Sequence, residues 1–225
     1  IKDLYGPALA EGEGMGTAYE YYAKRRVLEP WLKRRAKPKS ILIAGLPERY
    51  GLSLDFLLLA TELGAAVTVT DDRQESLERL RNTRNSLLQQ GSFRLGEPHT
   101  VLVDSFAQLG EIKGIYDLAL SSEVLQRLTP EDRGRFTQAI RSHSHAAALF
   151  APNADNSAHT NRSGLSGITL AEMEALASGS VSSTTGYIDM PPFPPGITRT
   201  DEQREQATTG TFENTVMWGL GRYAR

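Results

Sequence analysis

The sequence predicts an α/β fold, with a mostly parallel, doubly wound sheet, helices on both faces of the sheet and a helical segment before it. Short β-rich runs alternate with helix-like segments of ten or more residues from Ile41 onward. Gly45 closes the first run, and acids close the second and third runs at Asp71 and Asp104. Strands joined by helical crossovers run parallel and form right-handed units, which is the basis of the prediction.

The chain has 225 residues, a length that suits one domain of this kind with small additions. We expect an N-terminal arm and helix over residues 1–39 and the α/β domain over residues 40–190. A Pro-rich corner and a C-terminal helix over residues 191–225 are expected to pack on the same domain. Because the chain begins at Ile1 rather than Met, we also expect residues to precede it.

The composition argues against several classes of partner and site. The formal net charge of -2 argues against a nucleic-acid partner bound through a strongly basic surface. The lack of cysteine excludes disulfides, thiolate nucleophiles and Cys metal sites, and it fits a reducing compartment, so we expect a cytoplasmic protein. No apolar run reaches the about 18 residues of a membrane span, and no metal-binding spacing such as HExxH is present. We therefore expect neither a membrane partner nor a metal.

The residues before the first strand divide into two parts. Residues 1–16 are rich in glycine and small side chains, which predicts a loose arm. Residues 17–36 show helical spacing, and Tyr19 and Tyr22 are among the anchoring side chains. Pro30 is expected either to kink this helix or to start a second one.

The alternation then continues element by element. Leu54, Leu57 and Leu58 show helical spacing, and Gly64 is a suitable stop for that helix. Thr129 is a good N-cap for a later helix. We expect strands over 41–45, 66–70, 100–103, 116–120, 146–150 and near 181–188, and helices over 52–63, 73–90, 130–142, 170–178 and 201–222.

The carboxyl ends of the first four strands carry the residues best suited to bind a ligand. In open parallel sheets, ligands bind at this edge. Asp71 lies 20 residues beyond Gly51, a spacing suited to a carboxylate that binds ribose hydroxyls. A helix N-cap role is the alternative for Asp71 or Asp72. The residues expected at this edge are Gly45 to Gly51, Asp71 and Asp72, Asp104 to Phe106, and Ser121 to Glu123.

The order of these motifs resembles the Rossmann-like class I S-adenosylmethionine-dependent methyltransferases, especially their small-molecule branch. The motifs are ILIAGLPERYG at the first strand, AAVTVTDD at the second, VLVDSF at the third and YDLALSSEVLQRL at the fourth. The resemblance implies S-adenosylmethionine as cofactor and methyl transfer to a small-molecule substrate. It implies cofactor contacts from Gly45, Pro47, Gly51, Asp71, Asp72, Asp104, Ser105, Phe106 and Ser121.

The resemblance also suggests a role for each part of this edge. Gly45 would approach the methionine end of the cofactor, and Asp71 or Asp72 would bind the ribose. Asp104 would accept from the adenine amino group, with Ser105 and Phe106 beside the ring. The segment Ser121 to Glu123 would border the reacting methyl group and the substrate.

The first loop departs from the family pattern. It is longer than a GxGxG loop and has Pro47 near the place of the central glycine, and a proline has no N–H to donate. Arg127 stands where the family often has histidine. A second hypothesis is therefore a non-catalytic, methyltransferase-like binding or partner subunit. A nicotinamide-dependent enzyme is disfavoured because GxGxxG is absent.

Three residues are candidates for a catalytic base: His159, Glu123 and His145, in that order. His159 lies in a polar loop after the fifth strand, where an ordinary loop histidine is the alternative. His145 lies at a helix-to-strand turn, where it could instead cap the helix. Met190 and Phe193, in and beside the corner PPFPPG, fit either a hydrophobic lid over substrate or a contact in a homo-oligomer.

Overall fold

The computed structural model describes residues 2–12, 14–47, 51–91, 93–107, 109–110, 112–155 and 166–188. These residues divide into two compact units, one with the residues up to Ala36 and one that runs from Lys37 to Tyr187. The second unit holds the whole described sheet. His159 and the Pro-rich corner with Met190 and Phe193 lie outside the described residues, as do the helix expected over 201–222 and the middle of the first loop.

The larger unit is built on a five-stranded sheet in the order β3-β2-β1-β4-β5. All four neighbouring pairs are parallel, which confirms the predicted parallel sheet. The order reverses direction at β1, which therefore pairs with both β2 and β4. The strands are β1 (Ser40–Ala44), β2 (Ala66–Asp71), β3 (His99–Leu102), β4 (Leu118–Ser122) and β5 (Ala147–Phe150).

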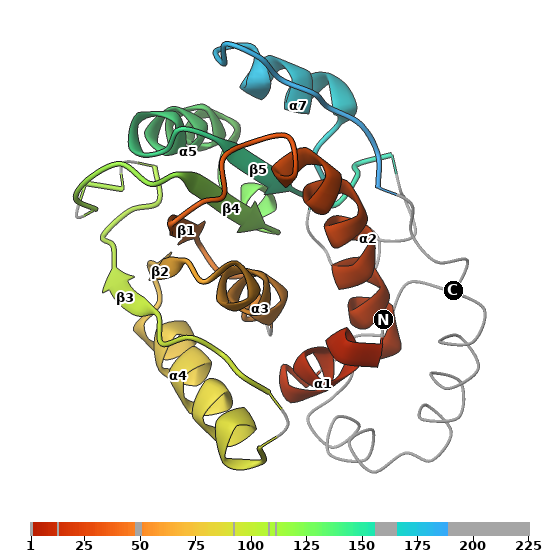
Figure 1. Ribbon diagram of the computed structural model, residues 1–225. Helices are drawn as coiled ribbons and strands as arrows, with labels where there is room; N and C mark the ends of the chain where they lie inside the picture. The colour runs from red at the N-terminus through yellow and green to blue at the C-terminus, as the bar shows by residue number, and fades with distance from the viewer. Residues whose placement is uncertain are drawn as a thin grey trace. The chain divides into compact units, whose positions relative to one another are not determined.

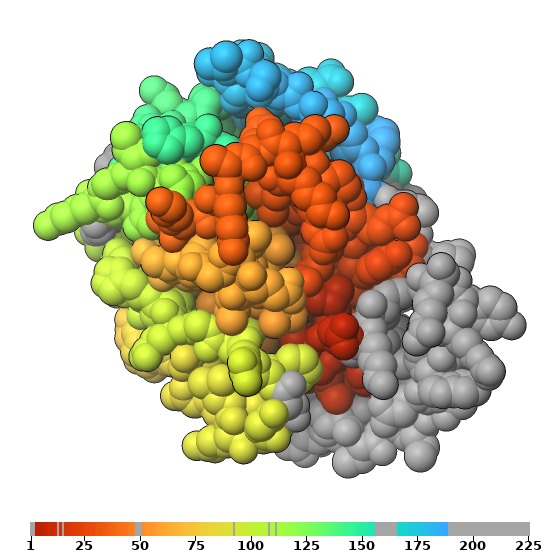
Figure 2. Space-filling view, viewed as in Figure 1, coloured from red at the N-terminus to blue at the C-terminus, as the bar shows by residue number. Residues whose placement is uncertain are grey.

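Helices cover both faces of this sheet, as the sequence predicts (Figure 1). On one face lie α3 (Leu54–Leu63) and α4 (Gln74–Gln89), and on the other lies α5 (Pro130–His143). A short 3₁₀ helix, η1 (Leu125–Arg127), connects β4 to α5, and α7 (Leu170–Ala177) packs beside α5. In the space-filling view, α4 (yellow) and α7 (blue) lie at opposite ends of the visible face of this unit (Figure 2).

The core follows from the alternation of side chains along the strands. Leu42 and Ala44 of β1 are fully buried in one cluster, together with Phe106 and with Phe136 of α5. The alternate positions of β1, Ile41 and Ile43, are also buried, and they point to the opposite face. A strand buried on both sides is typical of the centre of a parallel sheet.

The N-terminal unit contains two helices, α1 (Lys2–Ala10) and α2 (Met15–Leu32), which pack against each other. The prediction of a loose arm over residues 1–16 is therefore wrong. Leu4 and Ala8, one turn apart, are both buried, and burial of such a face stabilises a helix against a poor intrinsic propensity. Pro7 removes only one backbone hydrogen bond from α1.

Of the two alternatives expected at Pro30, a second helix is excluded, because α2 continues through Pro30 to Leu32. A proline in the last turn removes a single hydrogen bond. One further expectation is wrong. The strand expected near 181–188 is not formed. Val181 is fully exposed, and the Ser- and Thr-rich segment around it has side chains that compete for backbone hydrogen bonds.

Candidate functional site at the carboxyl edge of the sheet

The parallel strands bring the predicted residues of β1, β2 and β4 to one edge. Gly45 follows β1 directly, and its N–H donates to the carbonyl of Thr70 at 2.9 Å. Asp71 is the last residue of β2, and Ser121 lies near the end of β4. The prediction that these strand ends meet is confirmed by the register of the sheet.

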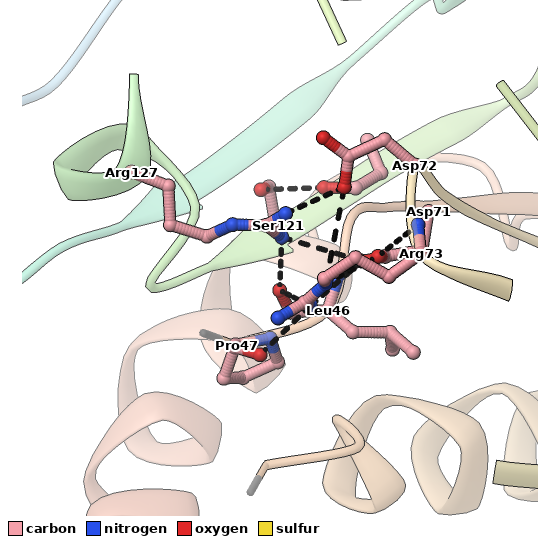
Figure 3. A network of polar contacts seen from close by, with 8 residues as sticks. Leu46, Pro47, Asp71, Asp72, Arg73, Ser121 and Arg127 are labelled. Carbon is pink, nitrogen blue, oxygen red and sulfur yellow. Dashed lines mark hydrogen bonds and ion pairs between the residues drawn. The ribbon is translucent and has the colours of Figure 1, made fainter. Parts of the chain in front are cut away.

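Asp71 is completely buried, and its carboxylate accepts hydrogen bonds from backbone and arginine groups of the protein (Figure 3). Oδ2 accepts from the N–H of Leu46 at 2.8 Å, which fixes the start of the first loop. Oδ1 accepts from the backbone N–H of Arg73 at 3.0 Å and from its Nε at 2.7 Å. Asp71 therefore joins the end of β2 to the loop after β1.

Arg127, at the end of η1, completes this network from the other side. Its Nη1 donates to the carbonyl of Leu46 at 2.8 Å and lies 3.3 Å from Asp71 Oδ2. Its Nη2 donates to Asp72 Oδ1 at 2.6 Å. The guanidinium also lies over the ring of Phe106, 4.9 Å from the centroid, which is cation–π geometry.

Arg73 contributes the second guanidinium. Its Nη2 donates to the carbonyls of Leu46 and Pro47, each at 3.0 Å. Together the two ionised arginines and two ionised aspartates carry no net charge, and the arginines bond the loop carbonyls of Leu46 and Pro47. No motif in the sequence indicates a role for Arg73. The replacement of a family histidine by Arg127 was the one signal that pointed to this network.

The two glycines of the first loop are required by the protein's own packing. Gly45 has φ +81, and a Cβ there would lie 2.6 Å from Cγ2 of Val124 and 3.1 Å from Cε1 of Phe106. A Cβ on Gly51 would lie 2.6 Å from Cγ of Pro47. Pro47 therefore packs on the glycine that ends the loop, and the side chains of Val124, after β4, and Phe106, after β3, pack on the glycine that begins it.

Residues at the end of β4 also form hydrogen bonds with neighbouring strands. Ser121 is buried, and its Oγ donates to the carbonyl of Ala44 at 2.7 Å, which ties β4 to β1. Glu123 adopts φ +56, uncommon for a residue with a side chain, and its N–H donates to the carbonyl of Phe150 at 2.9 Å. The structure thus brings Glu123 to the predicted edge.

The segment after β3 presents one apolar and two polar residues. Asp104 and Ser105 are exposed, and Ser105 Oγ accepts from the N–H of Ala107 at 3.2 Å. Phe106 is buried, with its ring edge-on to that of Phe136 at a centroid distance of 6.0 Å. Because β3 neighbours β2, Asp104 follows the strand beside the one that ends at Asp71.

His145 lies at the opposite, amino edge of the sheet, because it precedes β5 and its N–H donates to the carbonyl of Tyr116 before β4. The structure therefore does not bring His145 to the other candidates. At that edge, backbone N–H groups of Lys39 and Ser40 lower the pKa of Asp117 below its ordinary value of 3.8, and the charge of His145 adds a smaller effect in the same direction.

Within the described residues, no group of three or more His, Cys, Asp or Glu side chains could hold a metal ion. No helix in the described part of the chain is both long and apolar enough to cross a membrane. The described groups at the carboxyl edge include carboxylates, guanidinium groups and backbone amides.

Comparisons with known proteins agree on the fold. No family model matches the chain, and no curated protein matches it. The magnesium protoporphyrin IX methyltransferase ChlM from Synechocystis PCC 6803, with bound S-adenosylhomocysteine, is similar in structure with a TM-score of 0.54. The similarity covers 85% of this chain and 81% of ChlM at 15% identity.

Two further structures are similar. The methyltransferase domain of a bacterial Hen1 protein, CtHen1-CN, matches with a TM-score of 0.52 over 74% of this chain and 91% of that domain, at 20% identity. The chain spans 41% of TehB from Haemophilus influenzae, over 57% of its own length, at 20% identity and a TM-score of 0.41. The chain has the fold of class I S-adenosylmethionine-dependent methyltransferases.

Proposed function

We propose that this protein transfers a methyl group from S-adenosylmethionine to a small-molecule acceptor. The observation that carries the proposal is the pair of exposed carboxylates, Asp72 and Asp104, at the ends of neighbouring strands in a methyltransferase fold. Ribose hydroxyls and an adenine amino group are hydrogen-bond donors, so acceptors at these two places suit the nucleoside end of the cofactor. The ligand named for ChlM supports the same cofactor class here.

The bound cofactor would supply a methyl group activated by a sulfonium, so this chain's own task is alignment and exclusion of water. Asp72 and Asp104 would bind the nucleoside, and the turn at Gly45 would lie at the methionine end. Glu123, which directly follows β4, would accept a proton from the acceptor. His159, in the polar stretch of sequence that follows β5, is an alternative base.

A second candidate function is a methyltransferase-like binding subunit without catalysis. The arginine network favours it, because Arg73 and Arg127 take up the carbonyls of Leu46 and Pro47 and the carboxylate of Asp71. Backbone groups at this turn are the ones that a cofactor would use in a Gly-rich loop. In this chain they are bonded internally.

Calorimetric titration separates the two candidates. We expect S-adenosylmethionine and S-adenosylhomocysteine both to bind the purified protein, each with one site per chain. S-adenosylhomocysteine should also raise the melting temperature as its concentration increases, because it binds the folded state alone. Failure of both compounds to bind at about millimolar concentration, some 4 kcal/mol of affinity, would remove the enzyme proposal and leave the binding subunit.

A further inference from the structure

We propose that Asp72, rather than Asp71, is the carboxylate that receives the ribose hydroxyls, and that Arg127 is the positioning residue that orients it. The inference rests on the proposed function and deepens it, because it assigns one part of the cofactor to one side chain. Its basis is the different surroundings of two adjacent aspartates at the end of β2.

Asp71 has no acceptor capacity left for a ligand. A carboxylate offers about four lone-pair sites, and Asp71 already accepts five hydrogen bonds. Four come from arginine groups, counting the backbone N–H of Arg73, and one comes from the N–H of Leu46. Its side chain is also 0% exposed. A ribose hydroxyl could reach Asp71 only by displacing one of these donors, which would break a buried, charge-assisted hydrogen bond.

Asp72 has the opposite properties. Its side chain is 36% exposed, and its Oδ1 accepts from Arg127 Nη2 at 2.6 Å. The other carboxylate oxygen lies on the far side of the side chain from the guanidinium of Arg127 (Figure 3). That oxygen is placed to accept from a donor outside the network, and a ribose diol presents two such donors.

Arg127 holds Asp72 in this position because the arginine is itself fixed at several points. Its side chain is 11% exposed, its Nη1 bonds Leu46 and Asp71, and its guanidinium packs on Phe106. A planar guanidinium held in this way leaves Nη2 with one direction in which to donate. The carboxylate of Asp72 is therefore oriented before a ligand arrives, which reduces the entropy cost of binding.

The test is calorimetry with S-adenosylhomocysteine and with its 2′,3′-dideoxy analogue, which lacks both ribose hydroxyls. We expect Asp72→Asn to weaken binding of S-adenosylhomocysteine about 10- to 100-fold, the range of a hydrogen bond to a charged group. The same change should leave the affinity for the dideoxy analogue within about 2-fold. Glu75→Gln is the matched control, since it removes an exposed acid of the same sign on the first turn of α4.

Arg127→Gln tests the positioning role. It should weaken S-adenosylhomocysteine binding in the wild-type background, but have less effect once Asp72→Asn is present, because Arg127 acts on the hydroxyls only through the carboxylate of Asp72. Arg127→Lys keeps the charge and should restore only part of the affinity, because lysine lacks the planar fork. Thermal melting of each variant shows whether the fold is retained.

Each result has a defined meaning. Unchanged affinity of Asp72→Asn for S-adenosylhomocysteine, in a wild-type protein that binds it, would overturn this inference and leave the proposed function. An equal loss for the dideoxy analogue would also overturn it. A wild-type protein that binds neither compound would remove the proposed function itself, and the ribose assignment with it.

Discussion

The two edges of the sheet each use an aspartate to hold the backbone beside β1, but they do so in different environments. At the carboxyl edge, Asp71 accepts from Leu46, just after the strand. At the amino edge, Asp117 Oδ2 accepts from the N–H groups of Lys39 and Ser40, at 2.7 and 3.0 Å, where the strand begins. Asp71 is fully buried, whereas Asp117 is partly exposed.

This difference in burial explains why Asp71 pairs with arginines, whereas Asp117 accepts from backbone N–H groups. A buried carboxylate needs charged partners, because desolvation otherwise outweighs its hydrogen bonds. Asp71 has Arg73 and Arg127 for that purpose. Asp117 remains in contact with water, so backbone N–H groups are sufficient. The residues at the carboxyl edge therefore form a network of ion pairs in which the loss of one member destabilises the others. At the amino edge, Asp117 fixes only the start of β1.

The largest effect is expected from Asp71→Ala. The change removes the buried carboxylate that Arg73 and Arg127 share and leaves them only the partly exposed carboxylate of Asp72. We expect a cost of about 3 kcal/mol of folding free energy, the lower end of the range for breaking a buried ion pair. Urea denaturation followed by circular dichroism measures this cost. A loss below about 1 kcal/mol, the level of an exposed ion pair, would contradict the comparison.

Glycines with positive φ at the two edges provide the next test. Gly45→Ala should cost about 2–4 kcal/mol, because overpacking against Val124 adds to the cost of a left-handed backbone. Gly64→Ala, at the amino edge before β2, is the matched control: its φ is +66, but a Cβ would meet nothing within 4 Å. It should cost only about 1–2 kcal/mol.

The same denaturation measurements report on both glycine variants. The difference between them isolates the packing contribution, because both replace a glycine of similar φ. Equal losses would mean that Val124 and Phe106 move aside, and that the carboxyl edge is less tightly packed than the structure indicates. A Gly45→Ala protein that retains its stability would contradict the packing argument altogether.

The strand and helix order could be predicted because it depends on local patterns. Apolar runs such as 41–44, the stop at Gly64 and the cap at Thr129 each act over a few residues, and the structure confirms them. The two wrong predictions, a loose arm over residues 1–16 and a strand near 181–188, came from local patterns that the structure does not follow. Glycine and proline around Pro7 suppressed the prediction of α1, and Val181 in a β-prone segment suggested a strand that has no partner there.

The site could be predicted only in part. Parallel strands necessarily gather Gly45, Asp71 and Ser121 at one edge, so their meeting follows from the topology. Which carboxylate is buried depends instead on where two long side chains, those of Arg73 and Arg127, end in space. Arg127 reaches Asp71 from 56 positions away in the chain, and no periodicity encodes that contact.

The smallest effect is expected from Asp117→Asn, and its pH dependence distinguishes the two edges. The folded-state pKa of Asp117 is lowered chiefly by the N–H groups of Lys39 and Ser40, so its ionised form stabilises the fold. That contribution is fully present above the ordinary value of 3.8 and is lost as the pH falls through the lower folded-state pKa. The amide that replaces the carboxylate cannot ionise, so the variant should be modestly less stable than wild type near neutral pH.

Acidification should close this gap in stability, because the Asp117 carboxylate becomes protonated in the wild type once the pH falls through its lowered pKa. Urea denaturation of both proteins, from neutral pH down through that transition, measures the gap. Its closure on acidification would identify the negative charge of Asp117 as the source of the difference. A difference in stability that stays constant with pH would show that the negative charge of Asp117 does not contribute to the stability of the amino edge.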